Sequence, residues 1–121
     1  MRELKFRVWY DKSQCWIYFN LNKGFTDFGL KLYRELIVNG AKFYQFTGLK
    51  DMNGKEIYDK DIIKCFPSGI YGVVEWIEQL GTFTLQTIGN EYDTTVYGTQ
   101  IEGKNITREV VGNVYENPEY L

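Results

Sequence analysis

Residues 44–64 read YQFTGLKDMNGKEIYDKDIIK, and this stretch decides the fold because it encodes a strand, a turn and a second strand. The first strand is aromatic, and Thr47-Gly48 is predicted to break it. Asn53-Gly54 is the strongest short turn signal, because both residue types accept the positive φ that matches the twist of paired strands. Ile62-Ile63 then opens a β-branched run, which favours a second strand.

The composition extends this prediction to the whole chain. Aromatic residues make up 17% of the 121 residues, and there are twelve Gly but only two Pro, which favours strands and tight turns over helices. A chain of this length buries one core most simply. The sequence therefore predicts a single all-β domain over residues 1–121, with or without one short helix.

Charge and hydropathy restrict the partners and the compartment. The formal net charge is −2, which argues against broad non-specific binding to nucleic acid, because such binding depends on clustered Lys and Arg. No run approaches the roughly 18 apolar residues that span a bilayer, and the N-terminus has no apolar stretch of the signal-peptide kind. We expect no membrane partner and a cytoplasmic location.

The residues that most enzymes and metal sites need are missing from this sequence. It has no histidine, which removes Ser-His-Asp and Cys-His catalysis and the commonest zinc ligand sets. Cys15 and Cys65 lie fifty positions apart in apolar runs, and we expect reduced, partly buried thiols. We predict no enzymatic activity and no cofactor.

The N-terminal part is predicted to begin with a hairpin. Residues 3–9 alternate between polar and apolar, and residues 15–19 form a compact aromatic and β-branched run. Residues 20–29 are loop or one short helix, with Thr26 or Asp27 as a possible N-cap. After Glu35 we predict strands, in a hairpin about Asn39-Gly40.

The C-terminal part continues as short strands at close spacing. Strands are predicted at residues 72–77 and 82–88, followed by a loop with a brief strand at 91–105. A last strand at 108–115 is predicted to be bulged at Gly112-Asn113. This spacing suits a small barrel or sandwich better than a βαβ architecture.

Four blocks of the chain resemble the YopX family, small proteins of unknown function found mainly in phages and prophages of low-GC Gram-positive bacteria. The blocks are an opening, a middle signature in two pieces, a later strand and an ending. They comprise residues 2–9, 45–51 with 53–58, 72–76 and 109–118. The resemblance implies a small SH3-like barrel over residues 43–118, preceded by an N-terminal β-hairpin segment and variable region over 1–42.

The resemblance implies no activity, because the family has none established. This chain departs from the family pattern at Lys60, where the family usually has Gly. If that position requires positive φ, Lys60 is strained by up to ~1–2 kcal/mol. The residues that we assign to the structural motif are Thr47, Gly48, Leu49, Asp51, Asn53, Gly54, Tyr58, Asp61, Trp76, Gly112 and Asn113.

Four carboxylates gather at Asp51, Glu56, Asp59 and Asp61, but they lack the order of ligands of an EF-hand. Four lysines interleave with them, so an ordinary solvated hairpin surface is the favoured interpretation over a cation site. We therefore predict no metal.

The stretch around Arg7, Trp9 and Tyr10 mixes aromatic rings with basic side chains, and we consider it a candidate interaction surface. Such a mixture is used by small β-barrels that bind single-stranded nucleic acid. The alternative, which we favour, is an edge strand protected from aggregation by charge.

The excess of aromatic residues supports a function in protein binding. Twenty-one large rings are many for one core of this size, and exposed Tyr and Trp are enriched where proteins meet. The leading hypothesis is a non-catalytic phage or prophage accessory protein that self-associates or binds a phage or host protein. The alternative is a small β-barrel that binds single-stranded nucleic acid.

Overall fold

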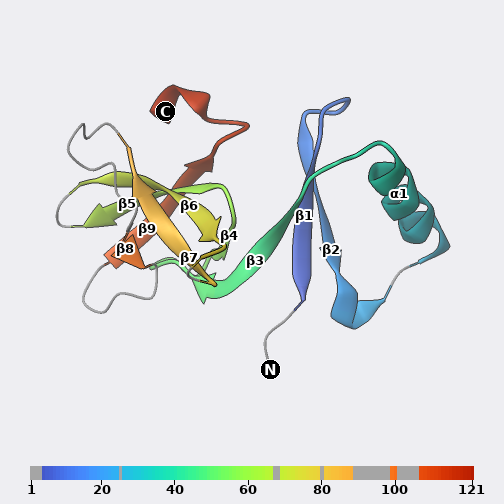
Figure 1. Ribbon diagram of the computed structural model, residues 1–121, viewed down its shortest axis with the longest axis horizontal. Helices are drawn as coiled ribbons and strands as arrows, with labels where there is room; N and C mark the ends of the chain where they lie inside the picture. Colours follow the sequence, from blue (N-terminus) through green and yellow to red (C-terminus); the bar gives the residue numbers. More distant parts are fainter. Residues whose placement is uncertain (1–3, 25, 67–68, 80, 89–98, 101–106) are drawn as a thin grey trace. The chain divides into compact units, whose positions relative to one another are not determined.

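The computed structural model describes residues 4–24, 26–66, 69–79, 81–88, 99–100 and 107–121. Most of them lie in β-strands, which form two antiparallel sheets, and one short α-helix interrupts the strands (Figure 1). One sheet curls into a half-barrel. The predicted fold class, all-β with a small barrel and one short helix, is confirmed.

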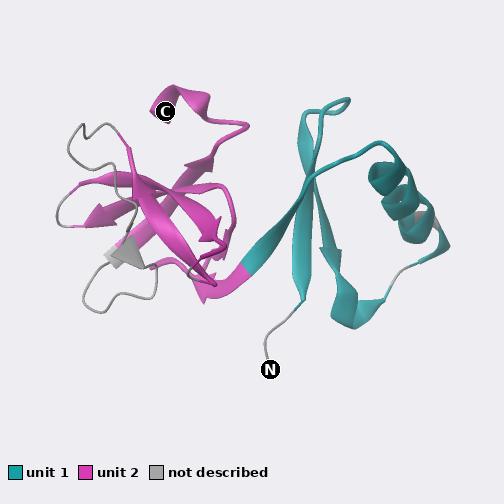
Figure 2. Ribbon diagram, viewed as in Figure 1, with its two compact units in different colours: residues 1–46 teal, residues 47–121 magenta. Residues whose placement is uncertain are grey.

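The chain divides into two compact units, unit 1 at residues 1–46 and unit 2 at residues 47–121 (Figure 2). The division falls inside strand β3 (Phe43–Lys50). This strand belongs to a four-stranded sheet with β1 (Lys5–Tyr10), β2 (Cys15–Asn20) and β4 (Glu56–Tyr58), in the order β2-β1-β3-β4.

Unit 1 begins with the predicted hairpin. β1 (Lys5–Tyr10) pairs antiparallel with β2 (Cys15–Asn20), and a turn at residues 11–14 joins them. The register places Phe6 opposite Phe19 and Arg7 opposite Tyr18. On its other side β1 pairs with β3, so β1 is the central strand of unit 1.

The helix α1 (Asp27–Val38) is where the sequence-based prediction was wrong. Thr26 caps its N-terminus, as one of the two predicted N-caps, and accepts a hydrogen bond from the Gly29 N–H. The predicted hairpin about Asn39-Gly40 does not exist. Asn39 is the C-cap, and Gly40, at φ 72°, makes the left-handed stop that commonly ends a helix.

Packing explains why the helix wins over a hairpin at residues 36–38. Leu36 is buried together with Val8 and Phe19, and Leu32 and Tyr33 of the same helical face pack against them. Helical spacing brings Leu32, Tyr33 and Leu36 onto one face, whereas a hairpin would divide them between two faces. Figure 1 shows α1 beside the β1–β2 hairpin, whose apolar side it covers.

Unit 2 contains the half-barrel. Its sheet has the order β8-β7-β6-β5-β9, and every described pairing in it is antiparallel. The strands of this sheet are β5 (Asp61–Phe66), β6 (Tyr71–Ile77), β7 (Thr82–Thr87), β8 (Thr99–Gln100) and β9 (Thr107–Asn113), whereas β4 belongs to the four-stranded sheet. Short 3-10 turns lie at Leu21–Lys23 in unit 1 and at Pro118–Tyr120 in unit 2.

The unit 2 core is aliphatic and aromatic and is separate from the core of unit 1. Its buried members come from four strands and are Ile57, Ile63, Cys65, Val74, Phe83 and Leu85. Cys15 and Cys65 are both free thiols, as predicted. Cys65 is buried, but Cys15 is exposed rather than partly buried.

The structure differs from the sequence-based prediction at two places in β3 and β9. Thr47-Gly48 does not break the first strand, since β3 continues to Lys50 with Gly48 at φ 90°. The last strand is bulged, but the extra residue is Val111 and not the predicted Gly112-Asn113, since Ile62 pairs with Gly112 while Ile63 pairs with Val110. The brief strand predicted within 91–105 is β8, and the other residues of that range lie outside the described part of the chain.

Candidate functional site

Residues 44–64, which we call the signature stretch, contain a tight turn. The buried carboxylate of Asp51 joins this turn to strand β9. Asp51 Oδ1 accepts hydrogen bonds from the backbone N–H groups of Asn53 (2.8 Å) and Lys55 (2.9 Å). Asp51 Oδ2 accepts one from the N–H of Val110 (2.9 Å), 59 residues away. One side chain therefore shapes the turn at Asn53-Gly54 and joins it to the last strand.

The surroundings of Asp51 keep its carboxylate charged. Burial raises the pKa, but hydrogen bonds from the N–H groups of Val110, Lys55 and Asn53, together with the charge of Lys55, outweigh burial. The net effect is a pKa below the ordinary value of 3.8. A carboxylate held in this way serves as a fixed anion and is poorly suited to general acid–base catalysis near neutral pH.

Thr47, Gly48 and Leu49 shape the end of β3. The Thr47 hydroxyl donates to the carbonyl of Ile57 (2.7 Å) and accepts from the Leu49 N–H (3.2 Å). Leu49 packs against the unit 2 core. These three motif residues fix the β3–β4 hairpin, which carries the Asn53-Gly54 turn.

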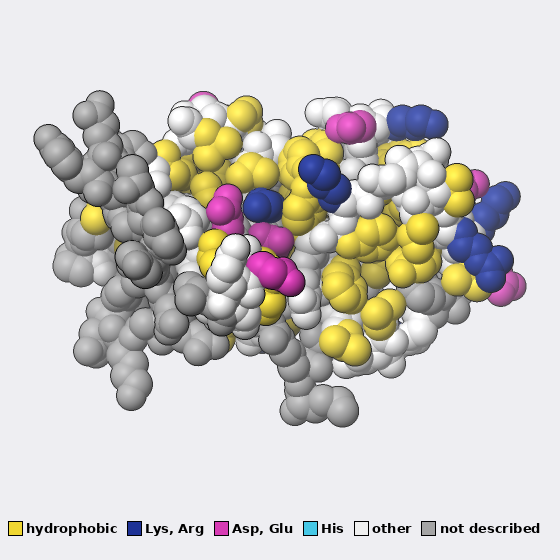
Figure 3. Space-filling model, viewed as in Figure 1, with side chains coloured by type: hydrophobic (Ala, Val, Ile, Leu, Met, Phe, Trp, Pro, Cys, Tyr) yellow, Lys and Arg dark blue, Asp and Glu magenta, His cyan; other side chains and the backbone are white. Residues whose placement is uncertain are grey.

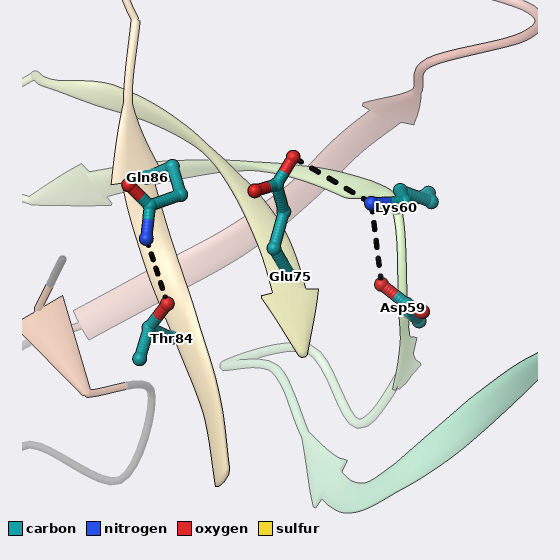
Figure 4. Close-up of polar contacts among 5 residues, drawn as sticks. All are labelled: Asp59, Lys60, Glu75, Thr84 and Gln86. Carbon is teal, nitrogen blue, oxygen red and sulfur yellow. Dashed lines mark hydrogen bonds and ion pairs between the residues drawn. The ribbon is translucent and has the colours of Figure 1, made fainter. Parts of the chain in front are cut away.

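The next motif residues, Tyr58 and Asp61, bracket a second turn. Asp61 is buried, and its Oδ2 accepts a hydrogen bond from the Tyr58 N–H (2.8 Å). Lys60 lies between them and has a φ of 73°, the positive φ at which we expect a residue other than Gly to be strained. Its Nζ lies 3.5 Å from Glu75 and 4.0 Å from Asp59 (Figure 4).

Gly112 and Asn113 hold the C-terminal turn. Asn113 Oδ1 accepts hydrogen bonds from the N–H groups of Tyr115 (3.1 Å) and Glu116 (2.9 Å). The Asn113 N–H donates in turn to Asn117 Oδ1 (3.2 Å). Gly112 leaves the space that the Asn117 side chain occupies, since a Cβ at this position would collide with it.

Trp76 differs from the other motif residues because it is partly open to solvent. Its side chain is 42% exposed, and its ring stands edge-on to Phe83 with centroids 5.0 Å apart. Its Nε1–H donates to Glu78 Oε2 (3.0 Å). Trp76 is therefore a fixed aromatic surface beside an exposed carboxylate.

The candidate surface at Arg7, Trp9 and Tyr10 is not brought together on one exposed face. Arg7 is only 4% exposed, with its guanidinium carbon 3.8 Å from the centre of the Trp16 ring. The favoured interpretation, an edge strand protected by charge, is wrong, because β1 pairs with strands on both sides and Arg7 is buried. Trp9 shares its sheet face with Arg7, whereas Tyr10 lies on the opposite face and packs against the unit 1 core.

The four carboxylates of the signature stretch do not converge. Asp51 and Asp61 are buried and brace separate turns, so the expected solvated hairpin surface is wrong for these two residues. Within the described residues, no group of three His, Cys, Asp or Glu side chains could hold a metal ion.

The Cys65 thiol is poorly suited to act as a nucleophile. Burial raises its pKa, and the charge of Arg108 lowers the pKa only in part. The raised pKa leaves less of the reactive thiolate.

The charge of the chain is divided unequally between the two units. Residues 1–46 contain eight Lys and Arg against four Asp and Glu, a formal charge of +4. Residues 47–121 contain six against twelve, a formal charge of −6, and the two together give the net −2. A nearly neutral chain therefore combines a basic unit with an acidic one.

The outer face of α1, which we define as Leu30, Lys31, Arg34, Ile37 and Val38, carries exposed apolar and basic side chains together. Val38 is 84% exposed and Ile37 51%. A shallow groove of about 350 Å³ is lined by four of these five residues together with Asp27, Glu35 and Asn39, so both signs of charge line it. Figure 3 shows Lys and Arg side chains, with Asp or Glu side chains among them, at the edge of unit 1 where α1 lies.

Sequence reasoning missed this face because residues 36–38 were assigned to a strand. The signal was present in the sequence, since positions 30, 34, 37 and 38 lie opposite the buried positions 32, 33 and 36 once the helix is extended to Val38. Two β-branched residues in succession, Ile37 and Val38, favoured the strand assignment instead.

Among the described residues, no helix is both long and apolar enough to cross a membrane.

No curated protein matches the sequence. A crystal structure of protein EF1440 from Enterococcus faecalis has the same fold, with a TM-score of 0.55 and 18% identity over 98% of each chain. The sequence model described as YopX protein matches residues 5–121, nearly the whole chain. The chain therefore belongs to the YopX family.

Proposed function

We propose that this chain is a non-catalytic accessory protein of a phage or prophage that acts by binding protein, and first of all a second copy of itself. The observation that carries the proposal is the outer face of α1, where Ile37 and Val38 are exposed beside a groove. Covering a fully exposed aliphatic side chain is worth roughly 1.5–3 kcal/mol, so an unoccupied face of this kind favours a partner.

The non-catalytic part of the proposal is supported by how the polar side chains are used. The buried carboxylates of Asp51 and Asp61 accept backbone hydrogen bonds within turns. Groups that stabilise turns in this way are not available to a substrate. We accordingly propose no enzymatic activity and no cofactor.

The proposed phage or prophage origin and the cytoplasmic location rest on the family resemblance and on the sequence. The further partner that we propose is a phage or host protein. Binding to single-stranded nucleic acid remains the alternative. It is less well supported, because Arg7 is buried and Tyr10 lies on the other sheet face from Trp9.

The experiment is size-exclusion chromatography with light scattering over a concentration series. We expect the mean mass to rise with concentration for the wild-type chain. The double variant Ile37→Ser/Val38→Ser should remain monomeric, because both side chains are exposed and their loss leaves the unit 1 core intact. Serine and valine have similar helix propensities, so α1 should persist.

The matched control is Leu121→Ser, which removes another exposed aliphatic side chain, in unit 2. This variant should associate like the wild type. A wild-type chain that is monomeric at every concentration would contradict self-association. Equal loss of association in the control and in the α1 variant would contradict the assignment to α1.

A further inference from the structure

We propose that the outer face of α1 on one copy binds the surface formed by Trp76 and Glu78 on unit 2 of a second copy. This inference rests on the proposed self-association and adds the surface that receives α1. It starts from the unequal charges of the two units, +4 and −6. A basic unit and an acidic unit on the same chain attract each other between copies, whereas two identical units repel.

The two cations on the α1 face are available for such a contact. Lys31 and Arg34 are exposed, and neither forms an ion pair with any described residue. They lie between Leu30 and Ile37–Val38 along the helix, and Asp27 and Glu35 line the same groove, so basic, acidic and apolar side chains share one strip. A surface of this kind fits a partner that offers an apolar group and a negative charge side by side.

Trp76 and Glu78 offer this combination on unit 2. The Trp76 ring is held edge-on to Phe83 and by its hydrogen bond to Glu78, so little side-chain freedom remains to be lost on binding. A guanidinium over a tryptophan face gains cation–π attraction, and an adjacent carboxylate adds to it. Partly exposed Trp and Arg are also the residue types that most often dominate binding energy in interfaces.

Several other acidic groups of unit 2 are already engaged within the unit. Asp51 and Asp61 accept backbone hydrogen bonds, and Glu75 pairs with Lys60. Glu78, by contrast, is exposed, and its described contact is the neutral indole N–H of Trp76. Its negative charge is therefore uncompensated by any described cation.

A contact between two α1 helices is the less favourable alternative. Around a two-fold axis near the middle of the helix, Lys31 and Arg34 of one copy would face the same two residues of the other. The 12 residues of α1 span only about 18 Å, so any single contact through α1, including the proposed one, is smaller than the roughly 800 Å² per partner of a standard interface. We therefore expect weak association that depends on concentration and weakens with salt.

A charge-swap experiment on the full chain tests the pairing. Arg34→Glu and Glu78→Arg should each raise the dissociation constant for self-association at least about tenfold, because each places like charges opposite each other. An equimolar mixture of the two variants should associate about as well as the wild type, because the two reversed charges then face each other across the contact. Analytical ultracentrifugation measures all three samples.

Two exposed residues outside the proposed contact provide matched controls for net charge. Lys12→Glu and Glu119→Arg change the net charge by the same amounts as the two test variants and should leave the dissociation constant within about twofold of wild type. Raising the salt from about 0.05 M to about 0.5 M should weaken wild-type association several-fold, because charges are then screened within a few ångströms.

The outcomes separate this inference from the proposed function. Wild-type association that is unaffected by Glu78→Arg, or that salt does not weaken, would overturn the α1–Trp76/Glu78 pairing and leave self-association intact. Failure of the mixed variants to associate, with circular dichroism showing both folded, would also overturn it. A strictly monomeric wild type would overturn this inference and the proposed self-association, and would leave a phage or host protein as the proposed partner.

Discussion

At the scale of single residues, Lys60 is the position where a departure from the family pattern corresponds to a measurable feature of the backbone. Its φ of 73° lies in the left-handed region, where a side chain costs ~1–2 kcal/mol. The Lys60 N–H donates to the carbonyl of Val74 and its carbonyl accepts from the Val114 N–H, and these bonds hold the conformation in place.

The first prediction at this scale compares Lys60→Gly with Lys60→Ala. Both variants lose the pair with Glu75, so the difference between them isolates the backbone. We expect the Gly variant to have the larger free energy of unfolding, by about 1 kcal/mol, which reverses the usual advantage of Ala over Gly. Urea unfolding of the two variants measures this difference.

Glu75→Gln is the control, because it removes the ion pair and leaves residue 60 unchanged. This partly exposed pair should contribute at most about 1 kcal/mol. An Ala variant as stable as the Gly variant would show that the turn relaxes to negative φ and would contradict the strain at Lys60.

The sequence allowed Lys60 and the turn residues to be predicted because turn chemistry is local. Asn53-Gly54 and the pattern around Lys60 act through the φ values of one or two residues, and such effects can be recognised without knowledge of the tertiary structure. The bond between Asp51 and Val110 could not be predicted in this way, because its partners are 59 residues apart. Only the folded unit 2 brings β9 against the signature turn.

At the scale of elements, the difference between local and long-range effects explains why the sequence did not predict the C-terminal part of α1. The alternating pattern of residues 3–9 and 82–88 predicts strands, and these are β1 and β7, although Arg7 and Thr84 among their polar residues are buried. The end of α1 has no such local signature, because Ile37, Val38 and Asn39-Gly40 favour a hairpin by propensity and a helix by packing. The face that we propose to bind a partner lies on this part of the chain, where local preference and tertiary packing disagree.

The hydrogen bonds from Asn53, Lys55 and Val110 to the Asp51 carboxylate, which we call the Asp51 clamp, join the turn to β9 and lead to a prediction. Asp51→Asn retains the size of the side chain but replaces one oxygen with an N–H₂ group. If Oδ1 stays with Asn53 and Lys55, the new donor faces the Val110 N–H, and β9 loses its bond to the turn. We expect the free energy of unfolding to fall by about 1–3 kcal/mol in urea titrations.

The clamp should also make stability depend on pH in a defined direction. The pKa of Asp51 is lowered by folding, so the unfolded chain binds the proton more readily than the folded chain. The contribution of Asp51 is fully present above its ordinary pKa of 3.8 and is lost as the pH falls through the lower folded value. The stability difference between the wild type and Asp51→Asn should therefore be constant near neutral pH and shrink below about pH 4.

Asp11→Asn is the matched control for the clamp. Asp11 is exposed and accepts a hydrogen bond from Trp9 Nε1, which an amide oxygen can also accept. This variant should change stability by less than about 0.5 kcal/mol at any pH. A loss in Asp51→Asn no larger than in the control would show that the clamp does not hold β9.

At the scale of the whole molecule, the division of charge favours the proposed function over nucleic-acid binding. Nucleic acid would be attracted to unit 1 and repelled by unit 2, whose formal charge is −6. The aromatic residues near the basic groups of β1 do not form an open stacking platform either, since Arg7 is buried against Trp16.

We therefore predict that the full chain does not bind a single-stranded oligonucleotide, even at about 0.02 M salt, where phosphate contacts are strongest. Fluorescence anisotropy of a labelled mixed-sequence DNA and of the matching RNA measures this directly. Binding that disappears in Lys31→Glu/Arg34→Glu would reassign the α1 face to nucleic acid, because the same cations would then contact phosphates instead of Glu78. Binding that survives in this variant would place the nucleic-acid site elsewhere on the chain and would contradict the purely protein-binding function that we propose.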